Sequence, residues 1–233
     1  MKFRLMGNPP IGILLVDKPT GITSHDVVYK VRKKTGVKRV GHTGTLDPLA
    51  TGLLIVLVGR EFTKRQTEFL KLDKDYICEA QLGVETDTYD VDGKTIKEAS
   101  WEELKKITET DFKRALDNFR GEINQTVPPY SAVKIKGEKL YEKARKGEII
   151  QEDLPSRRVL IKELKLIGFV KNAEQEELFF TIKVSCSSGT YIRSLVYDVG
   201  QQLGVGATTT SLRRTRIGKY KIEDAMNLQS FVA

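Results

Sequence analysis

The residues best suited to chemistry lie in one stretch, Gly41 to Gly52, which holds one carboxylate, one imidazole and three glycines. Glycine lets the backbone approach a ligand closely and adopt positive φ. Pro48 fixes its own φ and disfavours a helical conformation at Asp47. The apolar run Leu53–Val58 follows directly. The pattern predicts a rigid loop over 41–52 that carries Asp47 beside a buried strand, and catalytic groups concentrate on such loops.

Spacing alone leaves the roles of Asp47 and His42 open. An Asp-Pro pair in a loop most often forms only a turn. An isolated histidine is more often a surface or hydrogen-bonded residue than a catalyst. On this loop His42 could titrate near neutral pH, or it could stack on a base. The residues by themselves therefore give catalysis by Asp47 and a plain turn comparable weight.

Arg193 is a third candidate, at the start of a helix predicted over about 190–203. A cation is mildly unfavourable in the first turn of a helix, because the N-terminal end of the helix dipole is positive. A carboxylate partner such as Asp47 would explain the placement. Pairing with Asp198 or capping of a surface is an equal alternative.

The remaining patterns predict the elements that position these residues. A helix is predicted over 24–35, capped by Thr23 or Ser24, with the apolar stripe Val27, Val28 and Val31. Further helices are predicted over 61–71, 101–120 (one or two) and 138–146, and strands over 11–16, 53–59, 76–82, 131–136, 157–169, 178–186 and 207–221. Because the elements do not alternate as βαβ units, the predicted class is α+β, with a mixed, mainly antiparallel central sheet flanked by helices.

The net charge of +8 is unevenly distributed. Residues 1–75 carry 14 basic and 7 acidic side chains, residues 76–153 carry 13 and 17, and residues 154–233 carry 12 and 7. A basic balance split between both ends favours a polyanion such as nucleic acid as partner, with a solvated basic surface as the alternative. The densest basic cluster is Lys30, Arg32, Lys33, Lys34, Lys38 and Arg39.

Several classes of protein are disfavoured. No apolar run is long enough to cross a membrane, and residues 1–10 lack a secretory apolar region, so we expect a cytoplasmic protein. Cys78 and Cys186 are far apart and are expected to be buried free thiols. Two histidines and two cysteines without ligand spacing argue against a zinc site.

Four motifs resemble, in order, those of the TruB-type tRNA pseudouridine synthases. They are Gly12–Ser24, Gly41–Gly52, Tyr130–Lys134 with Gly137–Tyr141, and Gly189–Arg193 with Leu212–Arg214. The resemblance covers the chain from about residue 11 and implies the pseudouridine synthase fold. It implies isomerisation of uridine to pseudouridine at position 55 of the tRNA T loop, by base flipping and without metal or cofactor. It further implies a monomer that needs the tRNA T stem-loop but no protein partner.

The resemblance also implies site residues. Asp47 matches the catalytic aspartate, whose carboxylate adds to the uracil ring, attacks the ribose or drives proton removal toward a glycal; the sequence does not choose among these. Arg193 matches an arginine that offsets the rise in the pKa of a buried carboxylate, and Tyr76 matches the active-site tyrosine. Substrate-binding roles are implied for His42, which takes the space left by the flipped base, and for Tyr191, Leu212, Lys18, Arg213 and Arg214.

Some roles stay open under this resemblance. Lys18 either supports the loop through backbone contacts or touches phosphate. Asp87 and Asp90 match an acidic family segment for which the sequence suggests no clear role. The 30–39 cluster, with Arg213, Arg214 and Arg216, is expected to contact phosphates.

The chain departs from the family in one respect. Typical bacterial members continue into a C-terminal RNA-binding domain of the PUA type, whereas this sequence ends at Ala233. We therefore expect one catalytic domain, residues 1–233, with the PUA domain absent, either because the sequence is truncated or because the form is naturally short. A binding module that folds T-loop RNA without chemistry is one rival, which the intact Asp47 and Arg193 disfavour. A synthase for another RNA, such as a guide-dependent relative, is a second rival.

Overall fold

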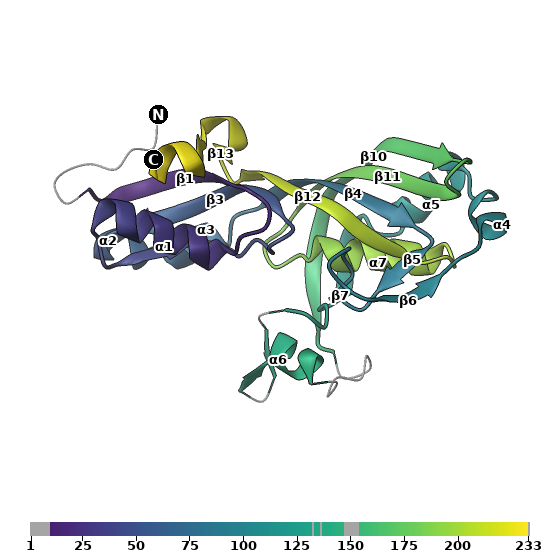
Figure 1. Ribbon diagram of the computed structural model, residues 1–233, viewed down its shortest axis with the longest axis horizontal. Coiled ribbons are helices and arrows are strands. Elements are labelled where there is room, and N and C mark those ends of the chain that lie inside the picture. Colours follow the sequence, from purple (N-terminus) through teal and green to yellow (C-terminus); the bar gives the residue numbers. More distant parts are fainter. Residues whose placement is uncertain (1–9, 132, 136, 147–153, 233) are drawn as a thin grey trace. The chain divides into compact units, whose positions relative to one another are not determined.

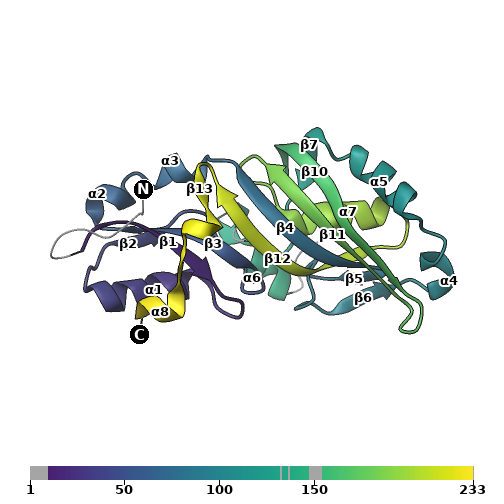
Figure 2. The ribbon, with the colours of Figure 1, turned by 90° about the horizontal axis from the view of Figure 1, so that it is seen from above.

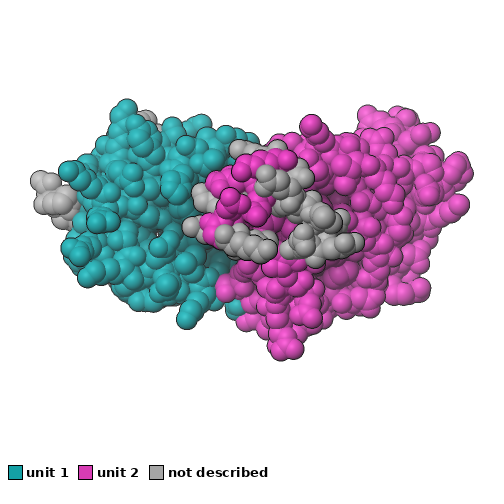
Figure 3. Space-filling model, turned by 90° about the horizontal axis from the view of Figure 1, so that it is seen from below, with its two compact units in different colours: residues 1–77, 211–233 teal, residues 78–210 magenta. Residues whose placement is uncertain are grey.

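The computed structural model describes residues 10–131, 133–135, 137–146 and 154–232 (Figure 1). The chain forms two compact units, shown in Figure 3: unit 1 comprises residues 1–77 and 211–233, and unit 2 comprises residues 78–210. The chain passes from one unit to the other within two strands, β4 (Lys74–Leu82) and β12 (Ala207–Ile217).

Unit 1 is built around a strand, β3 (Thr51–Val58), that is buried on both faces. It pairs antiparallel with β1 (Gly12–Lys18) and β2 (Val40–His42) and parallel with β12. Leu54, Val56 and Val58 pack toward α1 (Ser24–Thr35) and α8 (Leu228–Val232). Leu53, Ile55 and Leu57 pack toward α3 (Gln66–Leu70) and β13 (Tyr220–Lys221). Figure 2 shows α3 and β13 on one side of β3, and α1 and α8 on the other. Because apolar elements cover both faces, β3 is a continuous apolar run rather than an alternating one.

Helix α1 follows the predicted boundaries. Thr23 Oγ1 accepts a hydrogen bond from Asp26 N at 3.1 Å, and Asp26 Oδ2 accepts one from Thr23 N at 2.8 Å, which completes a capping box. The helix ends at Gly36, whose φ of 70° suits glycine. Val27, Val28 and Val31 are buried, so the predicted apolar stripe is confirmed.

Unit 2 is an antiparallel sheet with helices against it. β11 (Glu177–Cys186) pairs with β10 (Ser156–Asn172), and β10 pairs with β7 (Gly121–Thr126). Helices α5 (Glu109–Asp117) and α7 (Ile192–Gln202) pack on these strands and on each other. The smaller elements are β5 (Val84–Thr86), β6 (Thr95–Glu98), α4 (Trp101–Leu104), β8 (Lys134–Ile135), β9 (Glu138–Lys139) and α6 (Leu140–Arg145). Phe112 of α5 contacts Phe180 of β11, with ring centroids 4.5 Å apart.

The predicted fold class is confirmed, since the strands form a mostly antiparallel sheet with helices packed against it. Several boundaries are wrong. The helix predicted over 61–71 is two short helices, α2 (Arg60–Thr63) and α3. The strand predicted over 207–221 turns at Gly218, where a φ of 56° separates β12 from β13. The loop predicted over 41–52 shortens to 43–50, because β2 and β3 take both of its ends.

The central motif also differs from its prediction. Of the strand predicted over 131–136, β8 contains only Lys134–Ile135, while Ala132 and Lys136 lie outside the described residues. The helix predicted from 138 begins at Leu140, because Glu138 and Lys139 pair with β8.

The predictions about the two cysteines and about membrane-spanning segments can be compared with the structure. Cys78 and Cys186 are buried and are not joined in a disulfide, as predicted, and burial raises the pKa of the Cys78 thiol to about 12. None of the helices in the described residues is long and apolar enough to cross a membrane. The N-terminal segment used to predict localisation lies, apart from Pro10, outside those residues.

Candidate active site

The Asp47 loop, residues 43–50, is held by hydrogen bonds within unit 1. Thr43 N donates to Ile55 O at 3.0 Å, and Ala50 N donates to Asp47 O at 3.1 Å, which closes a turn through Pro48. The hydroxyl of Ser24 accepts from Leu46 N at 2.9 Å and donates to Leu46 O at 3.1 Å. The half-buried Asp47 therefore sits on backbone fixed on both sides.

The connection between β1 and α1 supports the same loop. Gly21 N donates to Pro48 O at 2.9 Å, and Thr20 Oγ1 donates to Leu49 O at 3.1 Å. The ammonium of Lys18, which is fully buried, donates to Ile22 O at 2.7 Å, Pro19 O at 2.9 Å and Pro48 O at 3.3 Å. These contacts favour the support role for Lys18 over phosphate contact.

Arg214 holds the loop from β12. Only 1% exposed, it donates from Nε to Leu53 O at 2.8 Å and from Nη2 to Gly44 O at 3.1 Å. Gly52 passes Arg214 so closely, with φ of 101°, that a Cβ there would lie 2.3 Å from Arg214 O. The guanidinium of Arg214 thus has a positioning role here, and its expected contact with substrate stays a prediction.

Burial shapes the electrostatics around Asp47. It lowers the pKa of Lys18 to about 8, although the nearby Asp47 carboxylate acts in the opposite direction. Burial also lowers the pKa of His42 to about 4, helped by the positive charges of His25 and Arg214. The ring of His42 meets His25 edge-on, with centroids 5.8 Å apart. At neutral pH His42 is therefore uncharged, which disfavours a role as a proton donor.

The other predicted residues of unit 1 have intramolecular partners or are buried. Arg213 binds both oxygens of Asp17, at 2.7 and 3.1 Å. Arg216 binds Asp75, with Nη2 to Oδ1 at 2.7 Å. Tyr76 of β4 is 8% exposed and Leu212 of β12 is 7% exposed. Whether these groups meet a substrate stays a prediction.

In unit 2, Arg193 is the second residue of α7, and its side chain is almost wholly buried. Nη1 lies 3.3 Å from Asp90 Oδ2 and donates to Thr88 O at 2.5 Å, and Nη2 donates to Tyr130 O at 3.0 Å. Asp90 is therefore a carboxylate partner of Arg193 in unit 2. The sequence missed this pair, because Asp90 and Arg193 lie on separate elements far apart in the chain.

The acidic segment that carries Asp90 is itself ordered by polar contacts. Asp90 Oδ1 accepts from Thr88 Oγ1 at 2.6 Å and from Asp92 N at 3.2 Å. Tyr89 adopts a φ of 64° and stacks on Tyr197, with centroids 4.0 Å apart. Asp87 Oδ1 accepts from Lys94 N at 2.8 Å. The segment that had no assigned role in the sequence thus presents a carboxylate to Arg193.

The structure brings the predicted residues together as two groups. Asp47, Lys18, His42 and Arg214 belong to unit 1, whereas Arg193 and Tyr191 belong to unit 2. The pairing of Asp47 with Arg193 stays a prediction. Among the described residues, no group of three or more His, Cys, Asp or Glu side chains has the arrangement of a metal site.

Comparison with models of known protein families shows which family contains the chain. The model of the N-terminal domain of TruB family pseudouridylate synthases matches residues 32–192. The chain belongs to the TruB family. The model of the tRNA pseudouridylate synthase B C-terminal domain matches residues 193–233 of this TruB-family chain. The predicted family and enzyme class are thereby confirmed.

Individual relatives agree with this membership. The chain is 43% identical over 217 residues to the tRNA pseudouridine synthase B of Clostridioides difficile strain 630. The aligned residues cover 93% of this chain and 69% of that protein. The chain is 42% identical over 229 residues to the tRNA pseudouridine synthase B of Protochlamydia amoebophila, covering 96% and 82%.

The fold of the chain is also similar to the folds of proteins in solved structures. An H/ACA RNP bound to a substrate RNA containing 2′-deoxyuridine has a TM-score of 0.68 at 26% identity, covering 95% of this chain and 52% of that one. The archaeal box H/ACA sRNP Nop10–Cbf5 complex has a TM-score of 0.66 at 25% identity, covering 94% and 52%. This TruB-family chain therefore spans about half the length of those solved chains.

Proposed function

We propose that this chain isomerises uridine to pseudouridine at position 55 of the tRNA T loop, with Asp47 as the catalytic carboxylate. In this reaction the bond from N1 of uracil to C1′ of the ribose breaks, and a bond from C5 to C1′ forms. One proton leaves C5 and one reaches N1, so the reaction needs no other reactant. The observation that supports the proposal most is the bracing of the Asp47 loop by three separate segments of unit 1.

That bracing suits the chemistry. A catalytic group must be held near its reactive geometry, because small misplacements cost large factors in rate. Asp47 lies close enough to the ammonium of Lys18 for the two opposite charges to attract each other. The uncharged ring of His42 can occupy the space that a flipped uridine leaves, and flipping costs a few kcal/mol. In our proposal Tyr76, Tyr191 and Leu212 contact the uracil, and Arg193 is the arginine that the family motif assigns to the active site.

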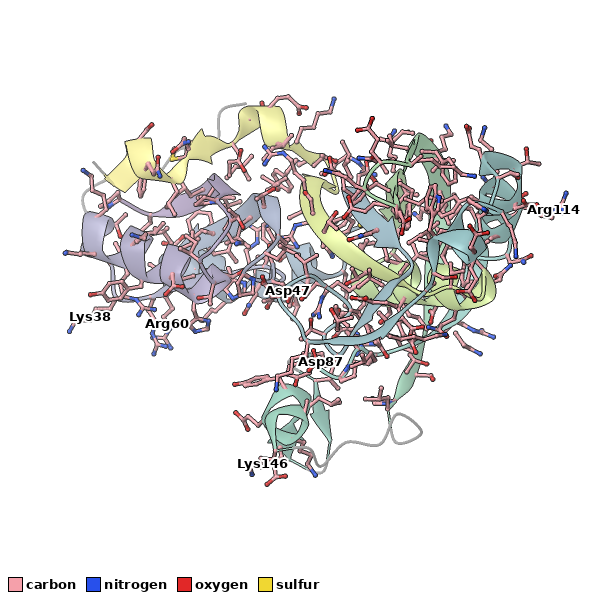
Figure 4. The ribbon with its side chains drawn as sticks, turned by 45° about the vertical axis from the view of Figure 1, so that its right-hand side comes forward. Lys38, Asp47, Arg60, Asp87, Arg114 and Lys146 are labelled. Atoms are coloured by element: carbon pink, nitrogen blue, oxygen red, sulfur yellow. The ribbon has the colours of Figure 1, made fainter. Side chains whose placement is uncertain are left out.

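The basic face of α1 is the proposed contact for tRNA phosphates. Tyr29 is 63% exposed and, with Lys30, Lys33 and Lys34, lines a shallow hollow. Figure 4 shows Lys38 and Arg60 reaching outward from unit 1. Arg213, Arg214 and Arg216 bind groups within the protein, and their contact with phosphates stays a prediction. We propose that the chain acts on the T stem-loop as a monomer in the cytoplasm, without cofactor or protein partner.

The test uses a 17-nucleotide T-arm RNA and full-length tRNA with uridine at position 55. Asp47→Asn is expected to abolish pseudouridine formation while RNA binding stays within about threefold of the native protein. The matched control is Asp224→Asn, which removes an exposed carboxylate of the same unit and should leave the rate unchanged. Turnover by Asp47→Asn would overturn the assignment.

The same assay separates the rival functions. A native chain that binds T-arm RNA but forms no pseudouridine would be a binding module. Mapping all modified positions in a total tRNA pool tests the position. Pseudouridine found only at positions other than 55 would contradict the assignment to the T loop and would indicate another RNA site as the substrate.

A further inference from the structure

Gln125 of β7 turns its side-chain amide into the interior of unit 2. Its neighbours Asn124 and Thr126 are exposed and half-buried, whereas Gln125 is fully buried. A buried side-chain amide is costly unless hydrogen bonds satisfy it. The hydrogen-bond partners of Gln125 therefore show which part of unit 2 it stabilises.

The amide of Gln125 pairs with both backbone groups of Tyr191. Nε2 donates to Tyr191 O at 2.9 Å, and Oε1 accepts from Tyr191 N at 2.7 Å. Tyr191 is the N-cap residue of α7, and its side chain makes no capping bond. Tyr191 O also accepts the first helical hydrogen bond, from Leu195 N at 3.1 Å. Gln125 therefore fixes the point at which α7 begins.

The cross-strand neighbour of Gln125 holds the same turn. Arg157 of β10 pairs with Gln125 in register, so both side chains lie on one face of the sheet. The guanidinium of Arg157 lies 5.2 Å from the centroid of the Tyr191 ring, and its Nη1 donates to Gly189 O at 3.4 Å. The ring and the backbone of Tyr191 are thus held by two adjacent residues of one sheet.

We propose that Gln125 is a positioning residue for the uridine site: it sets Tyr191 and, two residues further on, the stem of Arg193. The inference rests on the proposed function. Arg193 has three partners for its guanidinium in unit 2, and these bonds need the first turn of α7 in one place. Loss of the Gln125 amide frees that turn, removes the acceptor of Tyr191 N and leaves Tyr191 O with the helical bond from Leu195 N.

Gln125→Leu and Gln125→Glu test the proposal. With Gln125→Leu, the single-turnover rate of pseudouridine formation should fall about 10- to 100-fold, while the Kd for T-arm RNA changes less than threefold. Gln201→Glu, an exposed change on α7, is the matched control and should match the native rate. A native rate with Gln125→Leu would overturn the proposal.

Gln125→Glu gives a readout that a merely structural role would not move. Protonated, the new carboxyl donates to Tyr191 O and accepts from Tyr191 N, as the amide does. Ionised, it faces the carbonyl oxygen and repels it. Burial raises the pKa of such a carboxyl above its usual value of about 4.3. The ratio of variant to native rate should therefore fall at least tenfold between pH 5 and 9, and a ratio near one throughout would overturn the proposal.

A measurement without RNA separates this inference from the proposed function. Hydrogen exchange of the Tyr191 amide, followed by NMR, should be at least tenfold faster in Gln125→Leu than in the native chain. Unchanged exchange overturns the positioning role even if the native protein is active. Faster exchange in a native fold supports it even if the native protein forms no pseudouridine, and that last result overturns the proposed function alone.

Discussion

Asp90 and Arg193 form an ion pair in unit 2, with 3.3 Å between Oδ2 and Nη1 and side chains that are 8% and 5% exposed. Removing one member of a buried ion pair destabilises the fold, because the other charge stays buried without compensation. The pair therefore ties the acidic segment 86–94 to the start of α7.

Asp90→Asn is expected to lower the free energy of unfolding by about 3 kcal/mol, because it leaves the buried Arg193 without its counter-charge. Urea denaturation measures this. Asp92→Asn, on the same segment but exposed, is the control and should change stability by less than about 0.5 kcal/mol. Equal stability of the Asp90 and Asp92 variants would contradict the prediction.

Arg214→Lys should lower stability by about 2 kcal/mol and the catalytic rate at least tenfold. A lysine offers one compact ammonium, which cannot reach Leu53 O and Gly44 O as the planar guanidinium does. The neighbouring Arg213→Lys is the control, since Arg213 is 39% exposed in its pair with Asp17 and should cost under about 1 kcal/mol. Similar losses in both variants would argue against a brace specific to Arg214.

His42 should make the protein sensitive to acid. Its pKa is about 4 in the fold and about 6.5 in the unfolded chain, so the unfolded state binds more protons between these values. Native stability should therefore fall as pH drops from 6.5 to 4. His42→Gln removes this contribution. The unfolding free energy of the native chain minus that of the variant should decrease between pH 7 and 4.5 and stay constant between pH 7 and 8.

The basic face of α1 should be visible in the salt dependence of RNA binding. Replacing Lys30, Lys33 and Lys34 by Gln should reduce the slope of log Kd against log salt by about 1 for each phosphate that the variant no longer neutralises. Lys105 and Lys113 are exposed but pair with Glu102 and Glu109 in their own helices. Their replacement by Gln is the control, and an equal change in slope would show that the α1 face is not specific.

Local patterns in the sequence predicted the parts of the fold that depend on residues close together in the chain. The caps and apolar stripe of α1 form one such pattern, and the apolar run that follows Gly52 forms another. Within each pattern the residues are close together in the chain, so their spacing predicts the element. The boundary errors arose where short-range turns divide an element, as at Gly218.

The contacts that build the site join distant residues. Gln125 and Tyr191 are 66 positions apart, and the Arg193 guanidinium reaches Thr88 across 105. The periodicity of apolar residues in the sequence cannot predict such pairs, because they depend on which strands lie side by side in the folded sheet. Family resemblance indicated Asp47, Arg193 and Tyr191 as site residues but did not indicate Asp90 or Gln125 as their supports.

The bond from Arg214 to Gly44 spans 170 positions, which has a consequence for how the protein is made. A ribosome adds roughly 5–20 residues per second, so the Asp47 loop is synthesised roughly 10–30 s before its brace. During that interval unit 1 also lacks β12, the parallel neighbour of β3. The nascent chain therefore has no complete Asp47 loop until residue 214 has been translated, and premature termination before residue 214 yields a product without the brace.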